Sequence, residues 1–284
     1  MAGDALSLLL FPLRTGLNIA ALLAIGLALH GALGVVERPA LKTLRSTGLG
    51  ATVGVIVFAL ARLAMLNLQM GDGASLFDPD MVALSWIALG PSTLALLVGA
   101  AVIAASLLLA PSRILMAAGS FLLAAGFALT GHSQGLTDPG FAPPAVALHV
   151  LIAGYWVVAP ITLFPRGSLA NDQLHARLAV FSRWAIGAIP VLIALGVWLA
   201  WRIAGGLAPL LNSNYGRLLL LKLAVALAAM AMGALNKQVI TGKVLADPPT
   251  GRRWLRWTLG VESSLFLVAV VAVSAATTIG APGE

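Results

Sequence analysis

Two histidines have the chemistry and the spacing for a metal site at one boundary of a membrane. His132 ends one apolar run, and His149 lies about five residues inside the next, after a short loop. Antiparallel neighbouring helices would bring both imidazoles to the same boundary, and neutral imidazole is a good ligand for copper and zinc. Met70 and Met81 are further candidate ligands on the same side. The spacing leaves another interpretation open, in which His132 caps a helix and His149 forms a hydrogen bond within the bundle.

One carboxyl is expected inside the membrane. Glu262 is the only acidic residue within a predicted span, and an ionisable group there is a functional candidate by default. Asn236 is expected at a similar depth on the preceding span, and Arg183 at the start of another, so both are candidate partners. Glu262 and Asn236 would serve as a relay or gate for a transported ion, or as a polar clamp between the last spans.

Two basic residues also fall within predicted spans. Arg62 lies too deep to reach water easily, so we expect it to have a partner or a water-filled cavity, whereas Lys222 is shallower and could extend outward. Trp156 follows His149 by seven residues, on the same helical face, where it would line the site or simply pack. His30, near the inner end of the first span, is expected to form a hydrogen bond between helices.

The composition excludes a soluble globular protein. Of 284 residues, 60% are hydrophobic and 10% charged, whereas soluble domains are about 25% charged. The apolar runs suit helices, which need about 20 residues to cross a bilayer, and are too long for barrel strands. We therefore predict an all-α transmembrane bundle of about eight spans, forming one integral membrane domain over residues 1–284. The predicted spans cover residues 11–36, 47–69, 82–109, 113–131, 144–164, 180–204, 216–237 and 256–279.

The charges predict an orientation. The formal net charge is +7, but most basic residues fall in loops on one side of the predicted spans, which places that side in the cytoplasm. These residues are Arg38, Lys42, Arg45, Arg113, Arg166, Arg177, Arg183, Lys237, Lys243, Arg252, Arg253 and Arg256. Both termini are then expected outside, in the periplasm of a bacterial inner membrane. The basic charge is therefore a sign of topology, with a lipid bilayer and no nucleic acid as partner.

Missing motifs narrow the chemistry further. The chain has no cysteine, which excludes thiolate metal sites and thiol nucleophiles. It also lacks the G-x-x-x-x-G-K-[ST] motif of ATPases and the G-x-S-x-G and H-E-x-x-H motifs of hydrolases. We therefore expect a protein that is not an enzyme. Gly48, Gly50 and Gly54 would allow close helix contacts within a protomer or between protomers, so a homo-oligomer is a further expectation.

Several short segments of the second half occur in an informative order. They are Gly131-His132-Ser133, Leu148-His149 with Trp156, Phe181-Ser182-Arg183, Asn214-Tyr215-Gly216-Arg217 with Lys222, Gly233-Ala234-Leu235-Asn236-Lys237, Leu255-Arg256, Val261-Glu262 and Thr277-Thr278. This succession resembles the CopD/PcoD copper resistance family over about residues 120–284. Residues 1–110 resemble it only in hydropathy and in the number of spans.

The resemblance implies a polytopic inner-membrane protein of copper uptake that often works with a periplasmic, copper-binding CopC-like protein. Such a partner would act in trans here, because the first predicted span starts almost at the first residue. We therefore predict import of copper, as Cu(I) or Cu(II), from periplasm to cytoplasm, with capture at His132 and His149. The alternatives are a haem-binding membrane redox protein and a copper-binding scaffold or sensor that transports nothing.

Overall fold

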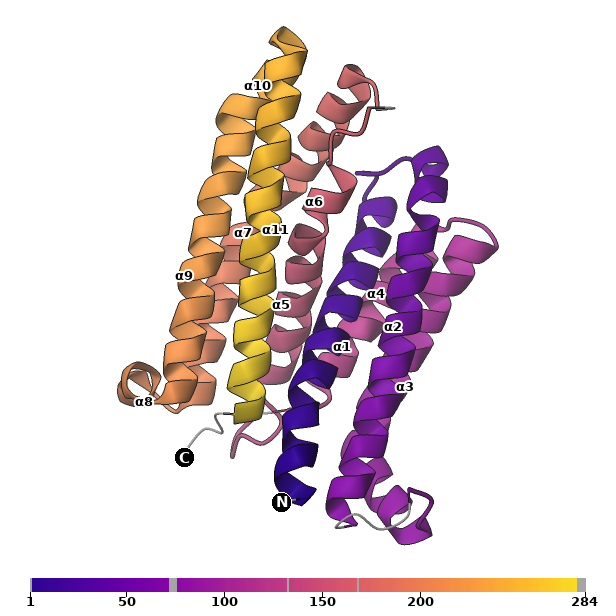
Figure 1. Ribbon diagram of the computed structural model, residues 1–284, viewed down its shortest axis with the longest axis vertical. Helices are drawn as coiled ribbons and strands as arrows, with labels where there is room; N and C mark the ends of the chain where they lie inside the picture. Colours follow the sequence, from indigo (N-terminus) through magenta and orange to yellow (C-terminus); the bar gives the residue numbers. More distant parts are fainter. Residues whose placement is uncertain (1, 72–75, 132, 168, 280–284) are drawn as a thin grey trace.

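The protein is a bundle of helices. The computed structural model describes residues 2–71, 76–131, 133–167 and 169–279, and all regular elements within these ranges are helical (Figure 1). The elements are α1 (Ala2–Ala32), α2 (Arg38–Met70), α3 (Pro79–Leu108), α4 (Arg113–Ala128), α5 (Ala142–Val157), α6 (Ala159–Thr162), α7 (Asn171–Ala204), α8 (Leu207–Asn212), α9 (Asn214–Leu235), the π-helix η1 (Asn236–Ile240), α10 (Thr241–Ala246) and α11 (Pro248–Ile279).

The predicted class, a polytopic helical membrane protein, is confirmed. Within the described ranges, seven stretches are long and apolar enough to cross a bilayer, with α5 and α6 together making one of them. The predicted span 113–131 corresponds to α4, whose 16 residues extend about 24 Å, short of the roughly 30 Å of a hydrocarbon core. Side chains such as Ile87, Ile114 and Phe121 are exposed on the outside of the bundle, which is where lipid would cover them.

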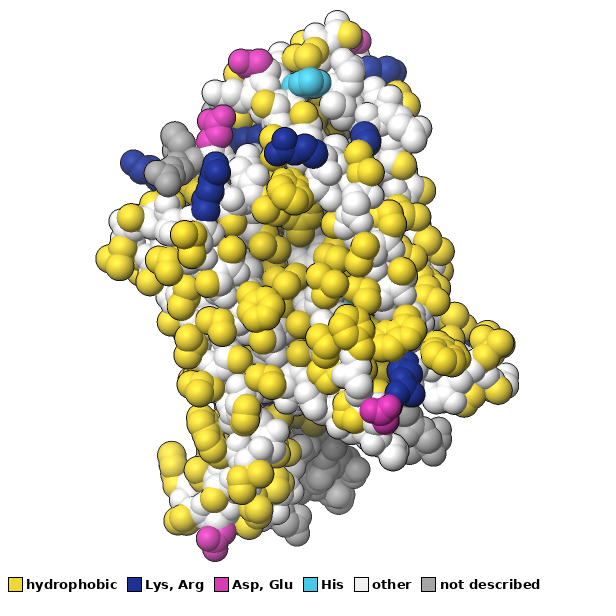
Figure 2. Space-filling model, turned by 180° about the vertical axis from the view of Figure 1, so that it is seen from behind, with side chains coloured by type: hydrophobic (Ala, Val, Ile, Leu, Met, Phe, Trp, Pro, Cys, Tyr) yellow, Lys and Arg dark blue, Asp and Glu magenta, His cyan; other side chains and the backbone are white. Residues whose placement is uncertain are grey.

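The helices alternate in direction. Residue 2 and residue 279 lie at the same end of the bundle, which we call the terminal end; the turns after α1, α3 and α6, together with α10, lie at the other (Figure 1). Lys and Arg side chains gather at that other end, which we call the basic end, and a broad band of hydrophobic side chains separates it from the terminal end (Figure 2). The separation of charge that the sequence predicts is therefore present in the fold.

Several helices extend beyond the predicted spans at the basic end, and α1 does so at the terminal end, where it starts at residue 2 and the span was predicted from 11. α2 starts at residue 38 where the span was predicted from 47, and α7 starts at 171 where it was predicted from 180. Likewise, α10 continues the line of α9 to residue 246. Hydropathy marks only the part of a helix that suits lipid, whereas charged residues such as Lys and Arg have good helix propensity and continue the helix into water.

Two glycines allow α1 and α5 to cross in close contact. A Cβ atom at Gly26 would lie 2.2 Å from the carbonyl oxygen of Gly154, and one at Gly154 would lie 2.7 Å from Cγ2 of Ile25. Because α4 also packs on α5, and α1 on α11, this crossing is one of several contacts that join the first four helices to the rest of the bundle. The predicted glycine face on α2 is split: Gly48 and Gly54 face neighbouring helices, whereas Gly50 has no atom nearby.

Candidate transport site

A cavity of about 220 Å³ lies in the half of the bundle nearer the basic end. Its walls come from α5 and α6, α7, α9 with η1, and α11, and most of the lining side chains are apolar. The polar members are Ser182, Asn236, Lys237, Thr241 and Glu262. On α9 and its continuation, the lining runs from Met230 to Thr241, about 16 Å along the helix axis. The cavity therefore borders about three turns of this helix.

Glu262 is the buried carboxyl of this cavity. Its side chain is 2% exposed, and Oε1 accepts a hydrogen bond of 2.8 Å from Nδ2 of Asn236. The hydroxyl of Thr258 donates to Oδ1 of Asn236, so the amide is held from both sides. The predicted pairing of Glu262 with Asn236 is present. Thr258 was not among the predicted site residues, although its position four residues before Glu262 on one helical face was a usable signal.

A π-helix holds Asn236 in place. The wider turn of η1 starts at Asn236, and the hydroxyl of Thr241 donates a 2.8 Å hydrogen bond to the carbonyl oxygen of Asn236. Single π-helical turns within α-helices are found frequently at functional sites. No residue type or spacing in the sequence indicated this turn.

Aromatic side chains close the cavity toward the terminal end. Trp156 is buried and lines the cavity, and its ring meets that of Phe266 edge-on at 5.2 Å between centroids. Leu192 and Ala229 complete this cluster. Trp156 therefore forms an apolar layer between the cavity and the half of the bundle that contains His149.

His149 lies about 10 Å from Trp156 along α5, toward the terminal end. Its Nε2 is 3.5 Å from Nζ of Lys222 on α9. Its Nδ1 is buried against α7, between the Leu192 carbonyl and Gly196, and makes no hydrogen bond of normal geometry. The imidazole thus joins three helices, and an incoming metal ion would have to displace the Lys222 ammonium or use Nδ1.

The other predicted ligands are not gathered around His149. His132 lies outside the described residues. Met70 ends α2 and Met81 is near the start of α3, and these two helices pack on each other and on α1 and α4 rather than on α7 or α9. Among the described residues, no group of three His, Asp or Glu side chains is arranged to hold a metal ion.

The remaining predicted basic groups have separate surroundings. Nη2 of Arg62 donates to Oγ1 of Thr130 at 3.2 Å, which supplies the partner that its depth requires. Arg183 lies 5.9 Å from the ring centroid of Trp184, and no ion pair joins it to Glu262 in the described part of the chain. The structure therefore does not bring Arg183 into the Glu262 cluster.

The segment around the cavity is the part of the chain that has recognisable relatives. Residues 175–276 match the family of copper resistance protein D. No curated protein and no solved structure matches the chain. The matched residues run from the second turn of α7 into the last turn of α11, so they include Glu262, Asn236, Thr258 and Lys222.

The match confirms the resemblance read from the sequence, over a shorter range. The matched segment contains α9 and nearly all of α7 and α11, which form most of the cavity wall, whereas His132, His149 and Trp156 precede it. The chain is therefore a multi-pass membrane protein related to copper resistance, and its cavity belongs mainly to the related segment.

His30 has a structural environment next to the copper resistance protein D segment. Its ring is fully buried; Nε2 donates to the carbonyl oxygen of Tyr155 at 2.9 Å, and Nδ1 pairs with the hydroxyl of Thr162 at 2.8 Å. Both partners flank the break between α5 and α6, where Pro160 cannot donate a backbone hydrogen bond. Since both nitrogens are engaged, His30 forms the predicted bond between helices and is not free to bind haem.

Replacing His30 by alanine should destabilise the protein by about 2–4 kcal/mol, because it leaves a cavity and removes the partner of a buried carbonyl. Thermal unfolding in detergent measures this effect. His175→Ala, at a partly exposed position on α7, should unfold like the wild type. An unchanged melting temperature for His30→Ala would contradict this assignment.

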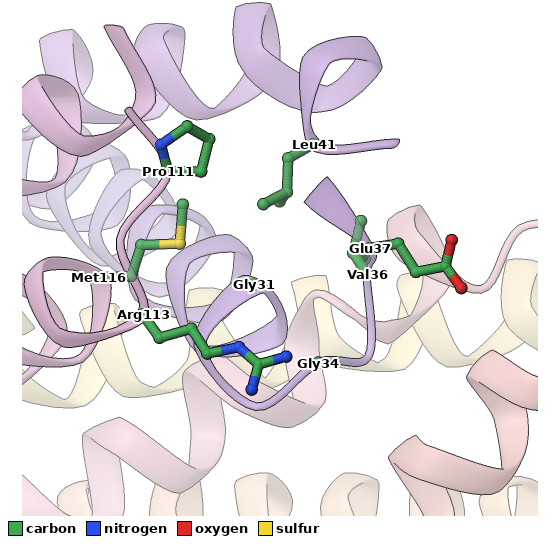
Figure 3. Close-up of a pocket in the computed structure, with 8 residues that line it drawn as sticks. All are labelled: Gly31, Gly34, Val36, Glu37, Leu41, Pro111, Arg113 and Met116. Carbon is green, nitrogen blue, oxygen red and sulfur yellow. The ribbon is translucent and has the colours of Figure 1, made fainter. Parts of the chain in front are cut away.

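A smaller cavity, of about 70 Å³, lies at the basic end between the turn after α1 and the start of α4. Figure 3 shows the guanidinium of Arg113 close to Gly34, with the carboxylate of Glu37 directed away from it. The thioether of Met116 shares this small space with the Arg113 guanidinium, and because the Glu37 carboxylate is directed away, the positive charge there is not offset and disfavours a cation. This cavity does not suit copper.

Proposed function

We propose that the chain imports copper across the bacterial inner membrane, from the periplasm to the cytoplasm. The observation that carries this proposal is the place of the family match: the segment related to copper resistance protein D forms most of the wall of an intramembrane cavity with a buried carboxyl. A carboxyl inside a membrane is costly and is usually found where an ion passes. A carboxyl used only for packing would not need a cavity beside it.

The proposed path of copper has two sites, one for capture near the terminal end and one in the cavity. Copper is captured near the terminal end, where His149 lies and where the sequence places His132. It then passes the apolar layer at Trp156 and Phe266 and enters the cavity, where Glu262 and Asn236 act as relay or gate. The cavity leads to the basic end, which the positive-inside rule assigns to the cytoplasm. Met70 and Met81 remain candidate ligands for an earlier step, at the ends of α2 and α3.

The driving force follows from the charge of the ion. The sequence has no ATPase motif, and a monovalent cation that enters gains about 2.3 kcal/mol per 100 mV of membrane potential. Handover from a periplasmic, CopC-like copper protein would add a concentration gradient at the outer surface.

Copper uptake into proteoliposomes tests the proposal. We expect wild-type protein to accumulate copper when an inside-negative potential is applied, and the double variant His132→Ala, His149→Ala to lose both most of the uptake and part of the copper binding. His175→Ala serves as the matched control, because this histidine does not line the cavity.

The other outcomes are distinct. Uptake and binding that are unchanged in the double variant would overturn the capture site. Intact copper binding without uptake by the wild type would indicate a scaffold or sensor. A strong Soret band in the purified protein would favour a haem-binding redox protein.

A further inference from the structure

α9 presents one methionine to the cavity and one away from it. Met230 lines the cavity together with Gly233 and Ala234, three and four residues further along the same face. Met232 lies on the same helix but not among the lining residues. Met230 also contacts the cluster of Trp156, Leu192, Ala229 and Phe266, so it lies at the closed end of the cavity.

The carboxyl of Glu262 faces the same stretch of α9. A Cβ atom at Gly233 would lie 3.9 Å from Oε1, so the carboxyl lies close to this glycine, and Met230, Gly233 and Glu262 all line the same cavity. Oε1 is engaged by Asn236, whereas Oε2 makes no hydrogen bond within the described part of the chain. One carboxylate oxygen is therefore available to a ligand in the cavity.

The charges around this space favour a cation near its closed end. Among the residues that the structure describes, Glu262 is the one acidic residue that lines the cavity. The one basic lining residue is Lys237, an exposed residue about 10 Å along the helix from Met230, at the basic end of the cavity. The flexible thioether of Met230 and the carboxylate of Glu262 share an environment of low polarity. Electrostatic attraction between the carboxylate and a cation is strong there.

The geometry points to a Cu(I) site formed by the thioether of Met230 and the carboxylate of Glu262, on the basic side of the Trp156 layer. The thioether is a soft ligand that suits Cu(I), and the carboxylate neutralises its charge. Two protein ligands hold an ion less firmly than a full coordination shell, as a transit site requires, because conduction needs binding that is weak enough to release. This assignment rests on the proposed function and adds a second site to it.

X-ray absorption at the copper K edge tests the site, with the purified full-length protein loaded with Cu(I) under ascorbate. Because the chain has no cysteine, every copper–sulfur distance must come from a methionine. Met230→Leu keeps the volume and removes the sulfur, and Met232→Leu is the matched control. We expect copper–sulfur scattering in the wild type and in Met232→Leu, and a clear decrease of it in Met230→Leu, with Cu(I) affinity at least about tenfold weaker in a chelator competition.

Glu262→Gln should retain the copper–sulfur scattering but bind Cu(I) more weakly than the wild type. Scattering and affinity that are unchanged in Met230→Leu would overturn the site. Elution volume and melting temperature show whether each variant is folded, and a second variant, Met230→Ile, repeats the test if Met230→Leu is not.

The two proposals can fail separately. If wild-type protein shows Met230-dependent copper–sulfur scattering but no uptake into proteoliposomes, the site stands and the import function falls. If uptake depends on His149 and Glu262 while Met230→Leu behaves like the wild type in every measurement, import stands and this site falls.

Discussion

Glu262→Gln should lower copper uptake into proteoliposomes at least about tenfold while the protein remains folded. Glutamine has the size of glutamate, and its carbonyl oxygen can accept the same hydrogen bond from Asn236, so the substitution removes mainly the negative charge. At an effective dielectric constant of about 20, a carboxylate attracts a monovalent cation 4 Å away by about 4 kcal/mol. Losing even a third of that attraction corresponds to a tenfold effect.

The variant Thr258→Val distinguishes a role of the Glu262 cluster in transport from a purely structural role. Valine has the shape of threonine without the hydroxyl that donates to Oδ1 of Asn236, so this variant should lower the melting temperature slightly and retain uptake. Glu262→Gln should show the opposite pattern. Wild-type uptake in Glu262→Gln, together with lower stability in both variants, would show that the cluster of Glu262, Asn236 and Thr258 is only a clamp.

Gly26→Ala should be among the most destabilising single-methyl changes in this chain. The added Cβ would lie 2.2 Å from the carbonyl oxygen of Gly154, a backbone atom that cannot move without separating α1 from α5. Overpacking of this kind costs about 1–3 kcal/mol and sometimes more. We expect a clearly lower melting temperature in detergent and a smaller folded fraction in size-exclusion chromatography.

Gly50→Ala is the matched control for this helix crossing. It is also a glycine-to-alanine change within a transmembrane helix, but no atom lies within 4 Å of the added methyl group. It should be neutral or slightly stabilising, because alanine has the higher helix propensity. Equal melting temperatures for Gly26→Ala and Gly50→Ala would contradict the close crossing of α1 and α5.

The sequence predicted the architecture well because the bilayer imposes simple rules on it. A stretch such as 82–109 has to be helical if it is to satisfy its backbone in lipid, and the structure has α3 at Pro79–Leu108. The start of α7 was missed by nine residues because its first turns, with Asp172, His175 and Arg177, are too polar for a hydropathy criterion. Helix formation and membrane insertion are different properties, and hydropathy predicts only membrane insertion.

The site was predicted in part. Glu262 and Asn236 were paired correctly because one intramembrane carboxyl has few partners at its depth. Arg183 was an equally reasonable partner by depth, but it lies beside Trp184 and away from the carboxyl. Depth fixes a position along the membrane normal and leaves the direction around the helix axis open. The same ambiguity explains why Met230 was overlooked, since its role depends on which face of α9 meets the cavity.

The position of the two chain ends has a consequence for tethering. α1 starts and α11 ends at the terminal end of the bundle, where α5 also starts on its way to His149 (Figure 1). A soluble copper donor joined to either end through a short flexible linker would therefore be held close to the same surface. Such tethering gives effective concentrations in the millimolar range, so a weak encounter between two proteins would become an intramolecular transfer. The described ends of the chain, residues 2 and 279, therefore both lie at the surface nearest the proposed capture site.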